Sequence, residues 1–278
     1  KSLYPKSTFI DIGSTKTKVK VDVQVDSDFA SRFCPTHPMA GRELDGPEGA
    51  QSDLFVGKSW IITPLPQTSG ESIALVKELI EKLGARVIAM SPEDHDAAVA
   101  AISHLPQVIS SLLAAQLEGM SPEHLALAGT GVLDTTRIAG SNPALWEEIL
   151  KLNKGALLPL LKDFQNDLST LISNLDSQAI EILKRGNQGR SRIPGKHHKQ
   201  KRNYVYLPVV IDDKPGQLAK LFDECAKVEV GVEDLSIEHS PEQETGLITL
   251  ALSPEGAKKL ELHLKSKNWR VHPPRSEK

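Results

Sequence analysis

His37 is the residue whose surroundings most clearly indicate chemistry in this sequence. Pro35 and Pro38 restrict the backbone on both sides of it, and Gly41 permits a turn that residues with a β-carbon avoid. A neutral imidazole, with an ordinary pKa of about 6.5, can accept a proton at neutral pH. We interpret His37 as a candidate general base. A buried structural histidine is the alternative that spacing alone leaves open.

Ser14 is the candidate partner of this histidine. Residues 8–12 have the β-branched and aromatic content of a short buried strand, which runs into Gly13 and Ser14. Open α/β sheets bind ligands at the carboxyl ends of such strands. If the two segments meet at that edge, the Ser14 hydroxyl can bond one nitrogen of His37 and fix its tautomer. A serine that only caps a helix is the alternative.

The composition is that of an ordinary globular protein. Of the 278 residues, 39% are hydrophobic and 25% are charged, and the net charge is −3, so nothing favours a nucleic-acid or membrane partner. Cys34 and Cys225 lie far apart, which argues against a disulfide framework. We find no signal peptide and no apolar run long enough to span a bilayer, and we predict a cytoplasmic protein.

Residues 1–90 alternate strands and helices. Strands are predicted at 60–64 and 86–90, with a helix at 71–83 whose apolar residues recur at the helical spacing. This succession predicts a parallel sheet with a right-handed crossover. The segment 16–28 is polar and β-branched, and we assign it no element.

Residues 91–185 are predicted to be all helical. Ser91 and Pro92 make a good helix start, and Pro106 should kink the helix that follows. Further helices are expected at 122–128, 143–152 and 157–184. The long helices are expected to form a homodimer.

The last part of the chain contains a linker and a small domain. Residues 186–203 are almost without apolar side chains and are interpreted as a solvated linker, with a basic patch for an anionic partner as the alternative. Residues 204–272 follow the order β-α-β-β-α-β of a ferredoxin-like domain.

The motifs of the first 150 residues together resemble the prephenate dehydrogenase (cyclohexadienyl dehydrogenase) family. The resembling segments are Asp11-Ile12-Gly13-Ser14-Thr15-Lys16, His37-Pro38-Met39-Ala40-Gly41-Arg42-Glu43, Gly46-Pro47, Asp53-Leu54-Phe55, residues 60–64, Ser103-His104-Leu105-Pro106, and Asp134-Thr135-Thr136-Arg137-Ile138-Ala139 with Pro143 and Trp146. Each motif is weak by itself, but their shared order and spacing are specific. Residues from 204 onward resemble an ACT domain, with Asp213-Lys214-Pro215-Gly216 as its turn.

The resemblance implies a fold and an activity. The fold is the carboxyl half of a Rossmann-like α/β domain, an all-α dimerisation domain and a small ferredoxin-like α+β ACT domain. The activity is oxidative decarboxylation of prephenate to 4-hydroxyphenylpyruvate in tyrosine biosynthesis, with hydride transfer to NAD. Arogenate as the substrate and NADP as the cofactor stay open.

The resemblance also implies roles for individual residues. His37 accepts the proton of the substrate hydroxyl, Ser14 orients His37, and Arg137 clamps a substrate carboxylate. The other expected contacts are His104, Arg42 and Asp134 for the substrate, and Gly13 and Ser14 for the cofactor. For Asp134 a surface capping residue is the alternative, and for His104 a polar residue that lines the helix kink.

The sequence departs from the family pattern at three points. Gln107 stands where many members have a second histidine, and Arg42 stands where many have Ser or Thr. The nucleotide-binding Gly-x-Gly-x-x-Gly does not occur, and Gly129-Thr130-Gly131 is no substitute because it lies between predicted helices. We therefore expect the chain to hold the carboxyl half of the nucleotide domain and to bind cofactor poorly alone.

Two hypotheses of other classes remain. A non-catalytic amino-acid-sensing module would bind tyrosine at the turn of the ACT-like domain, and feedback control by tyrosine combines this hypothesis with the enzyme. Its expected contacts are Asp213, Gly216, Gln217 and Leu218. Metal-dependent hydrolysis by His37, His95 and His104 is disfavoured, because positions nine apart on a helix lie about 180° apart. We expect no metal.

Overall fold

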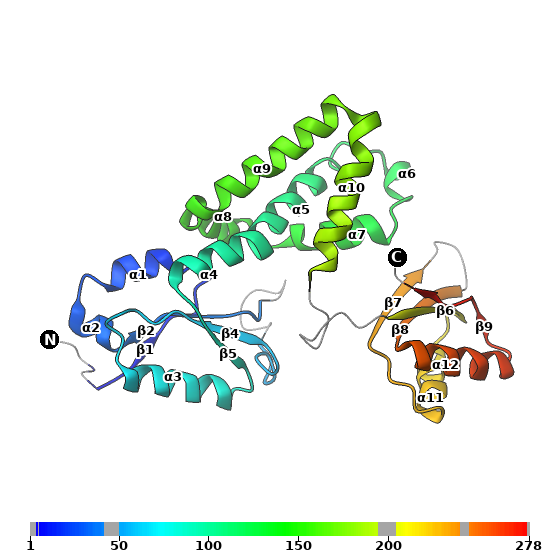
Figure 1. The fold of residues 1–278 in the computed structure, drawn as a ribbon, viewed down its shortest axis with the longest axis horizontal. Coiled ribbons are helices and arrows are strands. Elements are labelled where there is room, and N and C mark those ends of the chain that lie inside the picture. Colours follow the sequence, from blue (N-terminus) through cyan, green and yellow to red (C-terminus); the bar gives the residue numbers. More distant parts are fainter. Residues whose placement is uncertain (1–3, 5, 42–49, 194–203, 240–244, 277–278) are drawn as a thin grey trace. The chain divides into compact units, whose positions relative to one another are not determined.

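The computed structural model describes residues 4, 6–41, 50–193, 204–239 and 245–276. The chain forms two compact units, residues 1–175 and 176–278 (Figure 1). The first unit contains a small sheet region and a helical region. The second contains a long helix over residues 176–191, followed by an antiparallel sheet with two further helices.

Short strands build the sheet region of the first unit. Strand β1 (Phe9–Ile10) pairs in parallel with β2 (Phe33–Cys34). Strand β4 (Ser59–Ile62) pairs antiparallel with β3 (Thr36–Pro38) and parallel with β5 (Arg86–Ala89). The strands predicted at 8–12, 60–64 and 86–90 are confirmed, as is the parallel pairing across the predicted strand-helix-strand unit.

Helix α3 (Gly70–Lys82) connects β4 to β5 and covers the sheet. It begins at Ser69, whose hydroxyl accepts a hydrogen bond from the amide of Ser72 at 3.1 Å. Val76 and Ile80 pack against Cys34, Trp60 and Ile62 of the strands. The apolar spacing therefore predicted the helix, but of the apolar positions Leu79 and Leu83 are exposed.

The segment 16–28, which the sequence left unassigned, forms α1 (Thr17–Val23) and the start of α2 (Ser27–Ser31). The side chain of Lys16, the N-cap residue of α1, makes no capping hydrogen bond. Instead Asp96, far along the chain, accepts from the backbone amides of Lys16 and Thr17 at 2.8 Å each. The cap of this helix is tertiary, which explains why local patterns did not show it.

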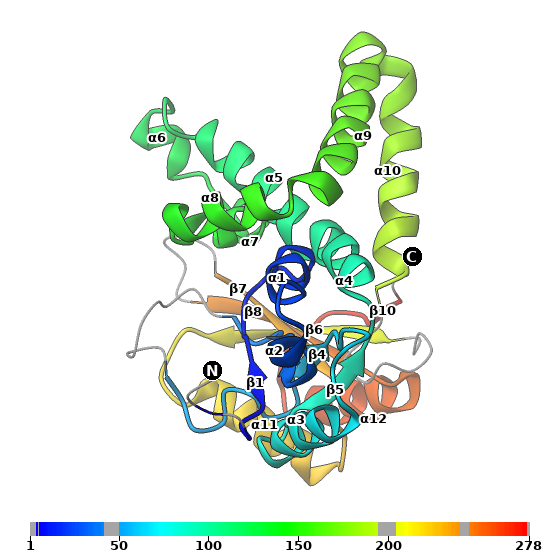
Figure 2. The ribbon, with the colours of Figure 1, turned by 90° about the vertical axis from the view of Figure 1, so that its left-hand side faces the viewer.

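One long helical path leads from the sheet into the helical region (Figure 2). It consists of α4 (Pro92–Val99), a π-helical turn (Ala100–His104) and α5 (Leu105–Ala115). Ser91 caps its start as predicted. Where Pro106 was expected to kink the helix, the chain forms the wider π turn, which accommodates a residue without an amide hydrogen.

This path is long and apolar enough to meet the length and composition of a membrane span. An 18-residue window within its 24 residues, Pro92–Ala115, reaches a mean hydropathy of 1.5. Length and composition are a weak indication of a membrane span, and this helix carries the buried His95, Asp96 and His104 of the site described below. It does not overturn the expectation that the chain has no membrane span.

The remaining helices of the first unit surround α5. They are α6 (Pro122–Leu125), α7 (Thr130–Thr136), a 3-10 turn (Arg137–Gly140), α8 (Pro143–Leu152) and α9 (Lys154–Ser173). Helix α9 packs against α5 and the π turn (Figure 1). The helices predicted at 122–128 and 143–152 are confirmed.

The predicted helix 157–184 is two helices. Helix α9 ends before Asn174, which leaves the helical conformation at φ −142°, and α10 spans Leu175–Ser191. The expected linker is also too long at its start, because α10 continues to Ser191 through Gly186 and Gly189. Glycine is unfavourable in a helix but does not forbid one, so composition misplaced this boundary. Residues 194–203 of that predicted linker lie outside the described residues.

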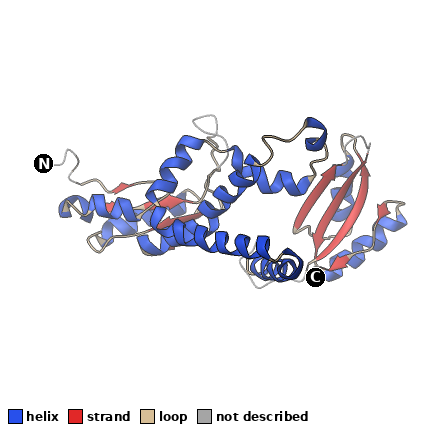
Figure 3. Ribbon diagram, turned by 90° about the horizontal axis from the view of Figure 1, so that it is seen from above, coloured by secondary structure: helices blue, strands red, loops and turns tan. Residues whose placement is uncertain are grey.

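The second unit has the β-α-β-β-α-β order predicted for residues 204–272. Its elements are β6 (Val205–Asp212), α11 (Gln217–Lys227), β7 (Asp234–His239), β8 (Thr245–Leu252), α12 (Pro254–Ser266) and β9 (Arg270–Val271), with β10 (Arg275–Ser276) added. The strands form an antiparallel sheet in the order β9-β6-β8-β7, and β10 also pairs with β6. Figure 3 shows the long strands of this sheet side by side. Leu221 of α11 and Leu260 of α12 pack on Leu207 and Leu250 of the central strands.

Candidate active site

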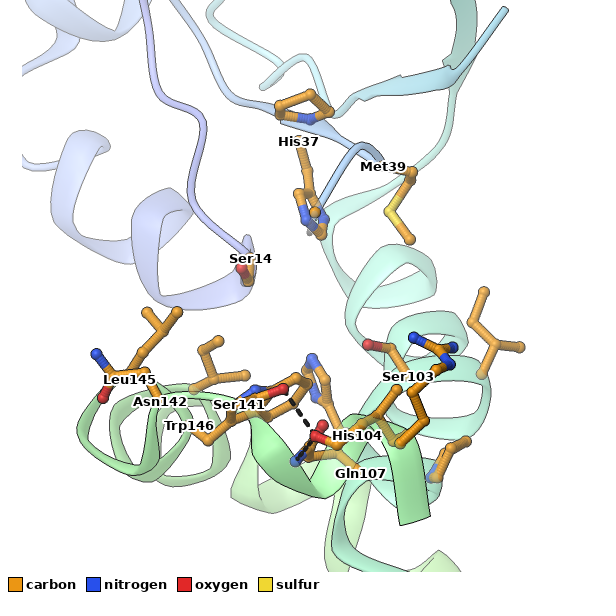
Figure 4. A pocket seen from close by; sticks show the side chains of 17 residues that line it. Ser14, His37, Met39, Ser103, His104, Gln107, Ser141, Asn142, Leu145 and Trp146 are labelled. Carbon is orange, nitrogen blue, oxygen red and sulfur yellow. Dashed lines mark hydrogen bonds between the residues drawn. The ribbon is translucent and has the colours of Figure 1, made fainter. Parts of the chain in front are cut away.

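One pocket of the first unit gathers residues from the sheet and from the helices (Figure 4). Its volume is about 510 Å³, which suits a small organic ligand. Ser14 and His37 line it on the sheet side, and His104 and Arg137 line it from the helical region. The fold thus brings together four residues that the sequence analysis selected from distant positions.

His37 is held by His95. Strand β3 places His37 opposite Ile61 of β4, and its Nδ1 lies 2.8 Å from Nε2 of His95 on α4. The rings meet edge to face, with centroids 5.1 Å apart. Ser14 was expected to bond one nitrogen of His37, and His95 holds Nδ1 instead. Ser14 lines the same pocket, but no hydrogen bond joins it to His37 within the described part of the chain.

A further hydrogen bond fixes the proton positions of this pair. Nδ1 of His95 lies 2.8 Å from Oδ1 of Asp96, and a carboxylate oxygen can only accept, so His95 donates from Nδ1. Nε2 of a neutral His95 is then an acceptor, and His37 must donate to it from Nδ1. His37 therefore keeps a bare lone pair on Nε2, which is the group that a general base needs.

Asp96 anchors this chain of hydrogen bonds as a carboxylate. Burial alone would raise its pKa, but hydrogen bonds from His95, Thr17 and Lys16 outweigh that effect and hold the pKa at about 2. The side chain of Asp96 is 5% exposed, and that of His95 is 0% exposed. The charge that orients both histidines is thus present at neutral pH and shielded from solvent.

His37 is neutral at neutral pH. Burial is the largest cause, and His95, Lys16 and His104 act in the same direction, so that the pKa of His37 falls to about 3. The Asp96 carboxylate opposes this shift without reversing it. An uncharged imidazole is able to accept a proton from a ligand in the pocket.

His104 presents a hydrogen-bond donor to the same pocket. The amide nitrogen of Asn153 donates to the backbone carbonyl of Asp96 at 2.8 Å and to Nδ1 of His104 at 3.0 Å. Because a carbonyl only accepts, the Asn153 amide has one orientation, and Nδ1 of His104 is an acceptor. Burial lowers the pKa of His104, so its neutral ring carries the proton on Nε2. Trp146 packs edge-on against this ring, with centroids 5.9 Å apart.

The estimate that His95 and His104 lie about 180° apart assumed a regular helix, but the π turn Ala100–His104 changes the angular spacing. His95 instead bonds His37, and His104 lines the pocket. Within the described residues, no group of His, Cys, Asp or Glu is arranged to hold a metal ion.

A buried ion pair supports the turn that carries Ser14. Asp11 pairs with the ammonium group of Lys16 and accepts from the amides of Gly13 at 2.9 Å and Thr36 at 3.2 Å. These bonds tie the end of β1 to β3, next to His37. Burial lowers the pKa of Lys16, although Asp11 acts in the opposite direction. The sequence analysis assigned no role to Asp11 or Lys16.

Arg137 lines the pocket at the start of the 3-10 turn. Helix α5 holds this turn, since Gln107 donates to the carbonyl of Ile138 at 2.9 Å and Ser110 donates to the carbonyl of Thr135 at 2.7 Å. Of the other two expected substrate contacts, only Asp134 lies in the described part of the chain, and it does not line the pocket. Asp134 is exposed on α7, and Arg42 lies outside the described residues.

Comparison with protein families assigns both the sheet region and the helical region to known domains. Residues 1–89 match the nucleotide-binding domain of prephenate dehydrogenase, and residues 91–188 match its dimerization domain. The chain belongs to the prephenate dehydrogenase family. It therefore combines a Rossmann-like nucleotide-binding domain with the helical domain of this family of NAD-dependent oxidoreductases.

Individual relatives agree with this assignment. Prephenate dehydrogenase of Bacillus subtilis is 29% identical over 258 residues, which cover 90% of this chain and 69% of the relative. The structure of prephenate dehydrogenase from A. aeolicus in complex with hydroxyphenyl propionate and NAD+ is 33% identical, with a TM-score of 0.58, and covers 66% of each chain. Synechocystis arogenate dehydrogenase is 32% identical, with a TM-score of 0.56, and covers 68% of this chain and 70% of its own. The chain thus spans about two thirds of these structures.

Gly13 follows β1, and a β-carbon at this position would come within 3.2 Å of the Asp11 carboxylate. Ser14 of the same turn lines the pocket. Because the sequence contains no Gly-x-Gly-x-x-Gly, we assign no residue of this chain to the diphosphate.

Proposed function

We propose that this protein catalyses the oxidative decarboxylation of prephenate to 4-hydroxyphenylpyruvate in the cytoplasm, with NAD as the cofactor, in tyrosine biosynthesis. The observation that carries the proposal is the bare Nε2 of His37, held by His95 and Asp96 in a pocket that Arg137 also lines. The family and the relatives described above support it. Both cysteines are free and buried, in keeping with a reducing compartment.

His37 acts on the proton of the substrate hydroxyl. NAD, when bound, supplies the acceptor for the hydride that leaves the carbinol carbon. As that carbon is oxidised its hydroxyl becomes acidic, and Nε2 of His37 takes the proton. Carbon dioxide is then lost because its departure makes the ring aromatic. The protein holds the substrate in place during this step.

Arg137 and His104 bind the anionic end of the substrate. The guanidinium fork of Arg137 matches a carboxylate, and Nε2 of His104 donates a further hydrogen bond. Prephenate has two carboxylates, so two donors of this kind are useful. Arg42 is a candidate for a second cation, and Asp134 is a candidate support for the Arg137 fork in the complex. Gly13 and Ser14 contact the nicotinamide in this proposal.

Arogenate is the second candidate substrate, because it has an ammonium group where prephenate has a keto group. The amide nitrogen of Gln107 is engaged by Ile138 and Ser111, so its carbonyl oxygen is the group left for a ligand. An oxygen acceptor can bind an ammonium group but gains nothing from a keto oxygen. The similarity to Synechocystis arogenate dehydrogenase points the same way. NADP likewise stays an alternative to NAD.

We further propose that the second unit is an ACT-like domain through which tyrosine inhibits a homodimer. Its support is the antiparallel β9-β6-β8-β7 sheet and the turn between β6 and α11. Gly216 has φ +85° at that turn, a conformation that favours glycine, and it starts α11. The proposed contacts of tyrosine are Asp213, Gly216, Gln217 and Leu218. Calorimetry with tyrosine tests this proposal, and phenylalanine is the matched control; absence of binding at millimolar tyrosine contradicts it.

The activity is tested by following reduced nicotinamide with prephenate or arogenate, each paired with NAD or NADP, in the full-length protein. The preferred pair names the substrate and the cofactor. A wild-type protein that is folded, binds NAD and turns over neither substrate overturns the proposed function. His124→Asn, a change of an exposed histidine on α6, is the control that should retain activity.

A further inference from the structure

In the proposed reaction the protein takes up one proton from the substrate and later returns one to the product. When the carbinol carbon loses its hydride, the O–H bond breaks and the proton goes to the protein. When the bond to the carboxylate carbon then breaks, its electron pair moves into the ring and leaves a phenolate oxygen, which takes up a proton to become the phenol. Hydride transfer and loss of carbon dioxide together release no net proton. The site must therefore hold one proton between the two steps.

His37 is a poor place to hold that proton. Its ring bonds His95 of α4, and the charges of Asp96 on α4, Lys16 before α1 and His104 of the π turn also act on it. Three of these four residues disfavour a positive charge on the ring. His95 has a different neighbour. Its Nδ1 donates directly to the carboxylate of Asp96 at 2.8 Å, so a positive charge on His95 is paired at once.

We propose that the substrate proton is stored on His95, a role that rests on the proposed dehydrogenase function. Nε2 of His37 accepts the hydroxyl proton, and Nδ1 of His37 passes its own proton across 2.8 Å to Nε2 of His95. His37 stays neutral in its other tautomer, and His95 becomes an imidazolium beside the Asp96 carboxylate. The reverse movement returns a proton to the phenolate oxygen. His95 is thus a positioning residue that acts through His37.

The residues around His95 shield the stored proton from solvent. His95 is 0% exposed and Asp96 is 4% exposed, so neither delivers the proton to solvent. The backbone amides of Lys16 and Thr17 occupy both oxygens of Asp96 at 2.8 Å each. These bonds keep Asp96 ionised, and the proton stays on the imidazole. A base that must return its proton to the same oxygen gains from such enclosure.

Nitrogen-15 NMR of labelled histidines in the unliganded full-length protein tests this store without turnover. At neutral pH we expect His37 to be protonated at Nδ1 and bare at Nε2. When a proton is added to this hydrogen-bonded pair, we expect His37 to remain neutral and to change to the Nε2-protonated tautomer. A titration in which His37 becomes charged while His95 stays neutral overturns the proposal.

Proton inventories test the same transfer during catalysis. In mixtures of light and heavy water, a plot of the wild-type rate against the deuterium fraction should be curved, as expected when two protons move in one step. His95→Asn can still accept from Nδ1 of His37 but cannot take a second proton, so its inventory should become linear and kcat should fall by about 100-fold. Comparing the rates with unlabelled substrate and with substrate deuterated at the carbinol carbon shows whether the measured rate reports the hydride step. His124→Asn should retain the curved inventory.

The outcomes separate the two proposals. A linear inventory in wild type, or an unchanged curved one in His95→Asn, overturns the proton store and leaves the dehydrogenase intact. Failure of the folded wild type to oxidise either substrate overturns the dehydrogenase. The tautomer change in the NMR titration then decides the His37–His95 transfer by itself.

Discussion

Asp96→Asn is the substitution that most directly tests the hydrogen-bonded chain beneath His37. The carboxylate accepts from Nδ1 of His95 and from the amides of Lys16 and Thr17, each at 2.8 Å. An asparagine has one oxygen and one nitrogen in their place, so at least one of these donors meets another donor. The variant should lose both stability and the orientation of His95.

The size of the stability loss follows from the pKa of Asp96. Its pKa is lowered from 3.8 to about 2 in the folded protein, and one pKa unit corresponds to about 1.4 kcal/mol, so the carboxylate contributes roughly 2 kcal/mol. A carboxyl group with a lowered folded-state pKa stabilises the fold above its unfolded pKa. That contribution is lost as the pH falls from about 4 to about 2, as Asp96 becomes protonated.

Urea denaturation of wild type and Asp96→Asn at neutral pH and at several lower pH values measures this effect. We expect a difference of roughly 2 kcal/mol at neutral pH that shrinks as the pH falls below about 4. Asp94→Asn, the same change at an exposed position of α4, should stay within about 0.5 kcal/mol of wild type. A difference below about 0.5 kcal/mol for Asp96→Asn, or one that does not shrink with pH, refutes the reasoning.

Four further outcomes are expected. His37→Ala should lower kcat by about 100-fold or more with little change in KM; steady-state kinetics that show unchanged turnover contradict its role as the base. Arg137→Ala should chiefly raise KM, because it removes a carboxylate partner; a fall in kcat at unchanged KM argues against that role. Asn153→Leu should lower the free energy of unfolding by about 1 to 3 kcal/mol, because it leaves Nδ1 of His104 without a donor; a calorimetric change near zero is the contrary result. Since burial holds the pKa of His37 at about 3, the pH profile of kcat/KM should show no loss of activity near 6.5, where a free histidine titrates.

Elements whose ends are set by neighbouring residues followed from the sequence. Ser91 caps the helix that it precedes, and Pro143 starts α8 where it was expected. In each case the capping or starting residue contacts the first turn of its own helix, so a local pattern carries the information.

Helix boundaries that depend on residues far along the chain could not be predicted from the sequence. Helix α1 is capped by Asp96, so nothing near Thr17 marks its start. The break at Asn174 and the continuation of α10 through Gly186 run against simple periodicity and composition. Such element boundaries are decided by tertiary hydrogen bonds, or by backbone conformations that several residue types can adopt.

The residues of the pocket divide in the same way. Ser14, His37, His104 and Arg137 were selected from their motifs, and they line one pocket. His95 was considered as a metal ligand and then set aside, because a regular helix would turn it away from the others. The π turn invalidates that geometry, and no rule of spacing in the sequence gives the position of such a turn.

The sequence by itself indicated an α/β and helical chain with a resemblance to the prephenate dehydrogenase family, which the comparisons confirmed, and it selected His37 as the candidate base. It also determined the β-α-β-β-α-β order of the last 70 or so residues. Tertiary structure alone decided which group holds His37. The bond runs between strand β3 and helix α4, from positions 58 residues apart, and its direction depends on Asp96, which is ionised because a third element donates its amides. A tautomer is set by the partners of both ring nitrogens, and those partners meet only when the chain is folded.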